Sequence, residues 1–202
     1  QHLYWPLGYG LTYMSWIFFL DIRKYFNKQI ARREGIKFPL SVHFGFWMTK
    51  LLYIFFFIVV PLQYYTVSEF LIGYIFYTFT TGIIISVIFQ LAHIVEGTSF
   101  AAPDPHSQTL ENDWATHQVK TTANFATKSK VISWLVGGLN FQIEHHLFPK
   151  ISHVHYPAIS KIVKEACAEF KLNYIEYPTV FEAVKAHVQF LKSMGQPSPS
   201  IA

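Results

Sequence analysis

The sequence predicts an all-α integral membrane protein, with a helical hairpin in the bilayer and a helical cap on its cytosolic side. Hydrophobic residues make up 51% of the 202 residues, aromatic residues 18% and charged residues only 14%. Two apolar segments are long enough to cross a bilayer. None of the 16 Lys and Arg residues lies between Leu51 and Val119, a gap that a soluble domain seldom leaves.

The two spanning segments are expected at residues 42–65 and 70–92. Each exceeds the roughly 20 apolar residues that cross a hydrocarbon core of about 30 Å. The short connection between them contains Tyr64 and Tyr65, which are typical interface anchors, and no Lys or Arg. This pattern predicts a helical hairpin whose turn faces away from the cytoplasm.

Basic residues ahead of the hairpin predict its orientation. They cluster in one polar stretch that contains Arg23, Lys24, Lys28, Arg32, Arg33 and Lys37. The positive-inside rule places such a stretch in the cytoplasm. Because two crossings return the chain to the same side, residues 93–195 are expected to form a cytosolic cap.

The other segments are shorter or more polar. Residues 5–20 are apolar but short for a bilayer core at about 1.5 Å per residue, so an interfacial or re-entrant segment is expected, with a tilted span as the alternative. In the cap, a short helix is expected near residues 130–135. Amphipathic helices are expected within 157–170 and 180–192. Residues 196–202 are expected to form a flexible tail.

Several classes of protein are disfavoured. The single cysteine, Cys167, leaves no internal disulfide framework and no Cys-ligated metal cluster. The pI near 9.0 fits a basic face at a membrane surface. No nucleic-acid partner is expected, because no basic motif is interleaved with exposed aromatic residues outside the apolar segments. The chain opens on Gln1 without an initiator Met, so a part of a longer protein is expected.

The segment QIEHHLFP, residues 142–149, carries the most specific chemical pattern. Gln142, His145 and His146 stand at i, i+3 and i+4 and therefore share one face of a helical turn. Adjacent imidazoles leave a helix about 100° apart and can address two metal ions or two corners of one. Neutral imidazoles suit a borderline transition metal such as iron. His93 follows the second spanning segment, where an isolated His ordinarily complements the helix dipole.

QIEHHLFP closely resembles the third histidine box of membrane fatty acid desaturases. It is similar to the front-end variant (delta-5, delta-6 or linoleoyl-CoA desaturase-like), in which Gln stands where other desaturases have the first His. Residues 1–6, QHLYWP, and 134–141, WLVGGLNF, resemble the same family. The resemblance covers residues 1–195 and implies the C-terminal portion of a desaturase domain. The metal ligands that it implies are His93, His145, His146 and Gln142.

The resemblance implies an oxidoreductase of lipid metabolism that makes unsaturated fatty acids. Such enzymes use two irons, O2 and two electrons to introduce a cis double bond into an acyl-CoA or acyl-lipid. No side chain removes hydrogen from an unactivated methylene, so metal and dioxygen must supply that chemistry. Cytochrome b5 or ferredoxin is the expected electron donor. The expected location is the bacterial inner membrane or the endoplasmic reticulum, with the histidine box on the cytoplasmic side.

Further residues are candidates for supporting roles. Candidates for orienting the ligand imidazoles are Glu144, Asn140, Asn124, His153 and His155. The last two alternate like a short extended segment, for which an ordinary polar loop is the alternative. Candidates for contact with substrate or lipid phosphates, or with an acidic electron donor, are Lys24, Lys28, Arg32 and Arg33. For these basic residues a purely orienting role in the membrane is the simpler interpretation.

One departure from the family pattern leaves other functions open. The first two histidine boxes, of the H-x₃₋₄-H and H-x₂₋₃-H-H types, are absent from these residues, and three imidazoles are too few for the usual two-iron site. One alternative is a related membrane diiron hydroxylase, conjugase or sphingolipid desaturase. Others are a zinc-dependent membrane hydrolase with an activated water, and a non-catalytic remnant. A haem-binding bundle is least favoured, because the histidine pair lies outside the apolar segments.

Because two histidine boxes are missing, the purified chain is expected to be inactive alone and to hold well under two irons. Elemental analysis of iron, normalised to protein by amino-acid analysis, checks this stoichiometry. Full two-iron occupancy together with turnover would contradict the expectation.

Overall fold

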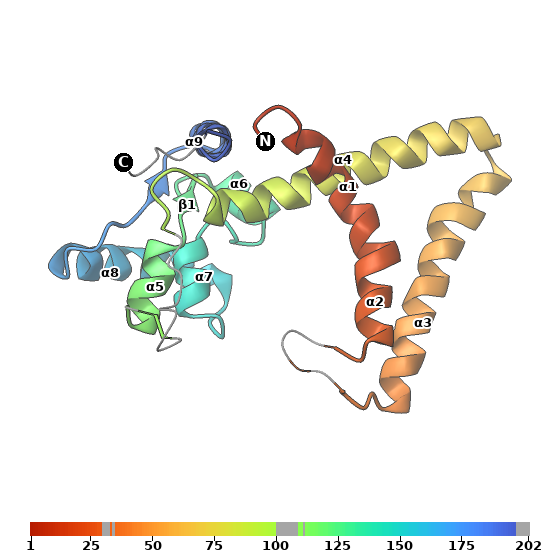
Figure 1. The fold of residues 1–202 in the computed structure, drawn as a ribbon, viewed down its shortest axis with the longest axis horizontal. Coiled ribbons are helices and arrows are strands. Elements are labelled where there is room, and N and C mark those ends of the chain that lie inside the picture. Colours follow the sequence, from red (N-terminus) through yellow and green to blue (C-terminus); the bar gives the residue numbers. More distant parts are fainter. Residues whose placement is uncertain (30–32, 34, 100–108, 111, 197–202) are drawn as a thin grey trace. The chain divides into compact units, whose positions relative to one another are not determined.

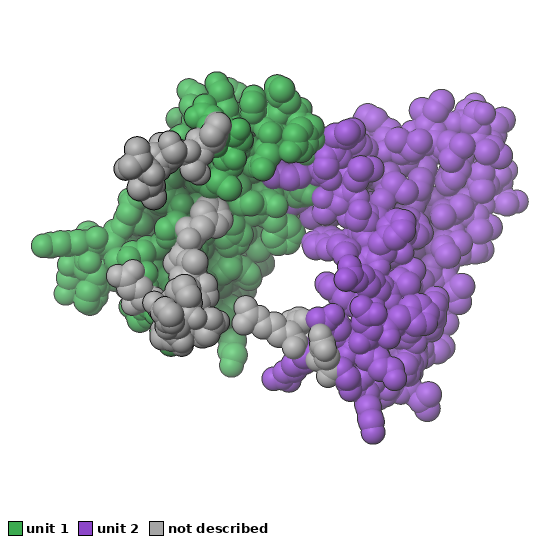
Figure 2. Space-filling view, in the orientation of Figure 1, with its two compact units in different colours: residues 1–5, 86–202 green, residues 6–85 purple. Residues whose placement is uncertain are grey.

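The computed structural model describes residues 1–29, 33, 35–99, 109–110 and 112–196 (Figure 1). The chain divides into two compact units, coloured separately in Figure 2. One unit contains residues 6–85. The other contains residues 1–5 and 86–202.

The described part of residues 6–85 is helical and forms three runs. The first consists of α1 (Trp5–Ser15), a π-helical turn (Trp16–Leu20) and α2 (Asp21–Phe26). The second consists of α3 (Leu40–Ile54), a second π-helical turn (Phe55–Val59) and a 3₁₀ turn (Pro61–Gln63). The third is α4 (Val67–His93), which continues into the other unit.

Two of these runs are long and apolar enough to cross a membrane. They span residues 40–63 and 67–93, close to the predicted 42–65 and 70–92. Most of their large apolar side chains are exposed, as expected for helices that face lipid or other helices. The prediction of two long apolar helices is therefore confirmed.

A capping box starts α4 at the hairpin turn. The backbone N–H and hydroxyl of Thr66 donate to Glu69 Oε2 at 2.9 and 2.7 Å, and the Glu69 N–H donates to Thr66 Oγ1 at 3.4 Å. This reciprocal arrangement satisfies backbone donors that a helix N-terminus otherwise leaves unpaired. It ends the turn that begins at Pro61.

The first helical run is longer than the apolar pattern predicted. Helix continues past Leu20 to Phe26 without a break. Lys50 forms an ion pair with Asp21 at 2.9 Å and also donates to the carbonyl oxygen of Ile17 at 2.9 Å. Ile17 lies in the π-helical turn, where the wider hydrogen-bond pattern leaves carbonyl groups available. A polar contact from α3 therefore supports α2 where the apolar pattern ends.

α1 and α4 approach closely at two glycines. A Cβ atom at Gly82 would lie 2.4 Å from the carbonyl oxygen of Gly10. A Cβ atom at Gly10 would lie 2.1 Å from the ring of Phe79. Small residues at such crossings let helix backbones pack closely where no hydrophobic effect drives association.

The other unit contains several short helices and one pair of strands. Its elements after α4 are α5 (Trp114–Lys120), β1 (Asn124–Phe125), α6 (Lys130–Leu135), α7 (Gln142–Leu147), a 3₁₀ turn (His153–His155), α8 (Tyr156–Glu169), β2 (Glu176–Tyr177) and α9 (Val180–Ser193). α6, α8 and α9 lie where helices were predicted. The strands β1 and β2 are parallel and correct the all-α prediction, because two-residue strands are too short to give an alternating pattern.

Two buried clusters hold this unit together. The first contains Leu91 at the end of α4, Phe125 in β1, and small residues of α9. The second contains residues of α5, α7 and α8: Val119, Ile143, Val163 and Cys167. The short helix α7 is therefore packed between α5 and α8.

The close contact between α1 and α4 leads to a test with two glycines of the same helix. We expect Gly82→Ala to lower the free energy of unfolding by about 1–3 kcal/mol, because the added Cβ collides with backbone. Gly73→Ala is the matched control, since a Cβ there meets nothing within 4 Å. Thermal unfolding in detergent, followed by circular dichroism, measures both. Equal stability of the two variants would contradict this packing.

Candidate metal centre

The histidine motif forms helix α7, which follows a two-glycine turn after α6. Gly137 and Gly138 have φ angles of +59° and +76°, which side chains disfavour. A Cβ at Gly138 would also lie 2.6 Å from the Cβ of His153. The glycines therefore allow the chain to reverse sharply and begin α7 at Gln142.

Three predicted ligands lie together at this helix. The ring centroids of His93 and His146 are 4.9 Å apart, and those of His145 and His146 are 5.7 Å apart. His93 is the last residue of α4, whereas the other two come from α7. Among the described residues, however, no group of three or more His, Cys, Asp or Glu side chains is close enough to hold a metal ion. The structure gathers the imidazoles without closing a complete ligand set.

Each of these imidazoles uses Nδ1 for a contact with another segment. The partners are the Thr121 carbonyl oxygen at 3.3 Å from His93, the Tyr156 hydroxyl at 3.3 Å from His145, and Gln118 Oε1 at 3.0 Å from His146. The partners of His93 and His146 are acceptors, so Nδ1 carries the proton and Nε2 keeps its lone pair. This tautomer is the one that a metal ion needs when it binds through Nε2.

The surroundings also favour the neutral form of His146. Burial, followed by the neighbouring His93 and His145, lowers the pKa of His146 to about 4. The imidazole is therefore deprotonated at neutral pH. Neutral imidazole is the ligand form, so the electrostatics of this position fit a metal ion.

Gln142 is buried at the start of α7 and has an orphaned amide. Its Nε2 atom has no hydrogen-bond partner among the described residues. Leaving a buried donor unpaired costs about 1–3 kcal/mol, so such a group is expected beside a ligand or at a functional site. The chemistry of Gln142 and the three imidazoles therefore fits part of a metal coordination sphere.

Glu144 is fully buried and anchors the middle of α7. Its Oε2 accepts from Asn124 Nδ2 at 2.7 Å, and its Oε1 accepts from the Tyr174 hydroxyl at 2.8 Å. Asn124 Oδ1 in turn accepts from the backbone N–H of Ile143 at 2.9 Å. Burial raises the pKa of the Glu144 carboxyl, and the hydrogen bonds from Asn124 and Tyr174 oppose that shift.

This network shows which groups Glu144 contacts. Both carboxylate oxygens bond to Asn124 and Tyr174, so a role of Glu144 in orienting the imidazoles stays a prediction that would act through the position of α7. A helix turns by about 100° per residue, so Glu144 leaves α7 in a different direction from the adjacent His145. Tyr174 was missed, because it is 30 residues from Glu144 and belongs to no local motif.

Asn140, His153 and His155 were the other candidates for supporting roles. Asn140 donates to Ser133 Oγ at 3.0 Å and to the Ala126 carbonyl oxygen at 3.3 Å, so it supports α6. His153 and His155 form an exposed 3₁₀ turn before α8 and not the extended segment that was expected. Backbone hydrogen bonding closes that turn, which alternation in the sequence did not reveal.

The basic candidate residues belong to the unit of residues 6–85. Lys24, Lys28 and Arg33 are exposed at or after the end of α2. Lys24 borders a cavity of about 380 Å³, which Phe38 also lines. Arg32 lies outside the described residues.

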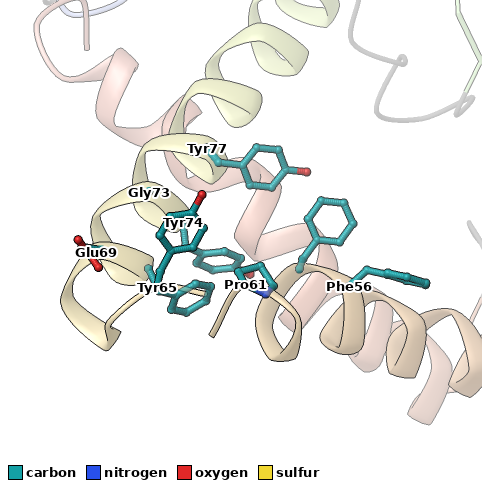
Figure 3. Close-up of a pocket in the computed structure, with 9 residues that line it drawn as sticks. Phe56, Pro61, Tyr65, Glu69, Gly73, Tyr74 and Tyr77 are labelled. Atoms are coloured by element: carbon teal, nitrogen blue, oxygen red, sulfur yellow. The ribbon is translucent and has the colours of Figure 1, made fainter. Parts of the chain in front are cut away.

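An apolar cavity of about 480 Å³ lies at the turn between α3 and α4 (Figure 3). Phe56, Tyr65, Tyr74 and Tyr77 line it, and Glu69 stands at its edge. Of these residues, Glu69, Tyr74 and Tyr77 belong to the first half of α4, whereas His93 is its last residue. The cavity is therefore a feature of the hairpin turn and not of the metal centre.

The Asn124–Glu144–Tyr174 network leads to a test by deletion of one hydroxyl. We expect Tyr174→Phe to lower the free energy of unfolding by about 1–3 kcal/mol, because it leaves a buried carboxylate oxygen without its donor. Tyr4→Phe is the matched control in the same unit, where the side chain is exposed. Chemical denaturation in detergent measures both variants. The proposed stabilisation by this network would be contradicted if the free energy of unfolding of both variants stayed within about 0.5 kcal/mol of wild type.

Comparisons with known proteins identify the family. Residues 1–178 match the family model for fatty acid desaturase. The chain is 39% identical over 198 residues to an acyl-lipid (8-3)-desaturase of Physcomitrium patens, covering 96% of this chain and 41% of that protein. It is 43% identical over 134 residues to an sn-1 linoleoyl-lipid 6-desaturase of Synechocystis sp., covering 66% of this chain and 37% of that protein. It is 32% identical over 204 residues to Delta(5) fatty acid desaturase A of Dictyostelium discoideum, covering 96% of this chain and 43% of that protein.

The chain spans about two fifths of the length of these relatives. No solved structure matches it significantly. The family match extends over 178 of the 202 residues and includes α4, α5 and α7, which carry the gathered imidazoles and the Gln118 contact. The chain belongs to the fatty acid desaturase family.

Proposed function

We propose that this chain is the C-terminal part of an oxygen-dependent desaturase that introduces a cis double bond into a lipid-borne acyl chain. The observation that carries the proposal is the convergence of His93, His145 and His146, each tethered through Nδ1, at the end of a long apolar helix. The names of two relatives, an acyl-lipid desaturase and a linoleoyl-lipid desaturase, favour an acyl-lipid over an acyl-CoA.

The proposed role of the chain's residues is to hold and orient iron. His93, His145 and His146 would bind through Nε2, with Gln142 beside them. When bound, iron supplies the activation of dioxygen that removal of hydrogen from an unactivated methylene requires. The contacts at Nδ1 keep His93 and His146 in the ligating tautomer, and the buried Glu144 keeps α7 in place.

Other parts of the reaction lie beyond these residues. Three imidazoles do not complete a two-iron site, so the remaining ligands are proposed to come from the part of the relatives that this chain does not cover. Two electrons per double bond must come from a fused or external donor, cytochrome b5 or ferredoxin.

The proposed topology places the site at a cytoplasmic membrane surface. The runs at residues 40–63 and 67–93 would cross the bilayer as a hairpin. The basic stretch before Leu40 favours a cytoplasmic start. His93 at the end of α4 then lies where the span meets the cytoplasm, within reach of acyl chains in the bilayer. Lys24, Lys28 and Arg33 are proposed to meet lipid phosphates on the same side.

The test uses the complete desaturase in a host that supplies lipid substrate and electron donor. We expect His146→Ala to reduce the unsaturated product at least 100-fold and to lower the iron content, because a ligand is lost. His43→Gln is the control, since His43 contacts Tyr25 in the other unit. We expect it to keep more than half of the activity. Gas chromatography–mass spectrometry of fatty acid esters measures product and bond position.

The same assay separates the alternatives. A hydroxylated product would favour a related membrane hydroxylase. Hydrolysis of a lipid substrate that proceeds without reductant and with zinc in place of iron would favour a hydrolase. Wild-type product from His146→Ala would refute the proposed role of the histidine motif.

A further inference from the structure

Helix α6 presents three large apolar side chains to its surroundings. Val131, Trp134 and Leu135 are 66%, 80% and 63% exposed. Their spacing of three and four residues places them on one face of the helix. Such a contiguous apolar face marks a contact with a partner or a membrane.

The opposite side of α6 is fixed in the protein. Ile132 packs against the buried cluster that contains Leu91 and Phe125. Ser133 Oγ donates to the carbonyl oxygen of Ser129 at 3.0 Å and accepts from Asn140 Nδ2 at 3.0 Å. The apolar face is therefore held outward by packing and hydrogen bonds on the inner side.

The same cluster lies at the end of the apolar span. Leu91 belongs to it, and Val87 packs against it from the preceding turn of α4. α4 has 27 residues and is about 40 Å long, roughly two turns more than a hydrocarbon core of about 30 Å. A helix of this length can extend about two turns beyond the hydrocarbon. α6 lies beside the last turns of α4, because Ile132 packs against the cluster that contains Leu91 (Figure 1).

The charges around α6 match a lipid surface. Lys128 and Lys130 are exposed at its N-terminal side. Residues 114–143 contain no Asp or Glu. Glu176 of β2 accepts a hydrogen bond from Thr127 and interacts with Lys128, but it is paired with Lys164. Trp134 carries the side chain that prefers the boundary between headgroups and acyl chains. Long Lys side chains reach phosphates from such a position.

From these observations we propose that α6 is a membrane-interface anchor. Val131, Trp134 and Leu135 insert into the boundary of the bilayer, and Lys128 and Lys130 meet lipid phosphates. Because only residues 136–141, which include the two-glycine turn, separate the end of α6 from the start of the motif helix α7, this anchor sets the depth of the histidines relative to the lipid. The inference rests on α4 crossing a membrane and not on the iron chemistry.

The test measures the depth of single spin labels in vesicles. Cys167 is replaced by Ala, and one Cys is introduced at Val131, Trp134 or Ile162 of the complete chain. The chain is reconstituted in phosphatidylcholine–phosphatidylglycerol vesicles. Ile162 on α8 is the matched control, because it is 66% exposed like Val131 but belongs to the helix that packs in the other cluster. Circular dichroism confirms equal helix content in the labelled proteins.

Power-saturation electron paramagnetic resonance then compares accessibility to oxygen, which partitions into lipid, with accessibility to a water-soluble nickel chelate. We expect labels at positions 131 and 134 to favour oxygen at least twofold, and the label at 162 to favour the chelate. Preference for the chelate at position 134 would overturn the proposal. Low accessibility to both reagents there would also overturn it, since protein would then cover the face. Neither iron nor turnover enters the measurement, so its failure leaves the proposed function standing.

Discussion

The buried carboxylate of Glu144 is the constraint on which the candidate metal centre depends. A carboxylate removed from water is costly unless hydrogen bonds compensate it. Asn124 and Tyr174 provide that compensation, one to each oxygen. Asn124 lies in β1, and Tyr174 lies shortly before β2, so the parallel pairing of these strands brings both donors to α7. A sheet of two-residue strands therefore matters more than its size suggests, because it fixes the helix that carries two of the imidazoles.

The imidazoles themselves are held by a second set of contacts. His146 is tethered to α5 through Gln118, and His145 to the start of α8 through Tyr156. Because the Nδ1 contacts fix ring orientation, little rotational freedom remains to be lost when a metal binds. Burial keeps His146 neutral, which is the form that ligates. The neutral form and the ring orientation of His146 thus come from the same packing, which places α7 between α5 and α8.

The proposed function gives a reason for this packing at the end of a long apolar helix. An acyl chain that resides in lipid would lose about 0.8 kcal/mol for each methylene exposed to water. A proposed metal centre at the last residue of α4 would shorten that path. The proposed anchor at α6 would serve the same requirement, since it would hold this unit against the lipid surface. The end of α4 and the inner side of α6 meet in one buried cluster, whereas α7 packs in the other.

The sequence alone determined the features that neighbouring residues encode. Continuous apolarity predicted the two long helices, amphipathic spacing predicted α8 and α9, and the i, i+3, i+4 pattern placed Gln142, His145 and His146 on one turn. Only the tertiary structure decided what those residues touch. Glu144 meets Tyr174 across 30 positions, and His146 meets Gln118 across 28, so no local period could report either contact. Sequence periodicity shows which face of a helix or strand is apolar. A hydrogen-bond partner from a distant segment is determined only when the two segments pack together.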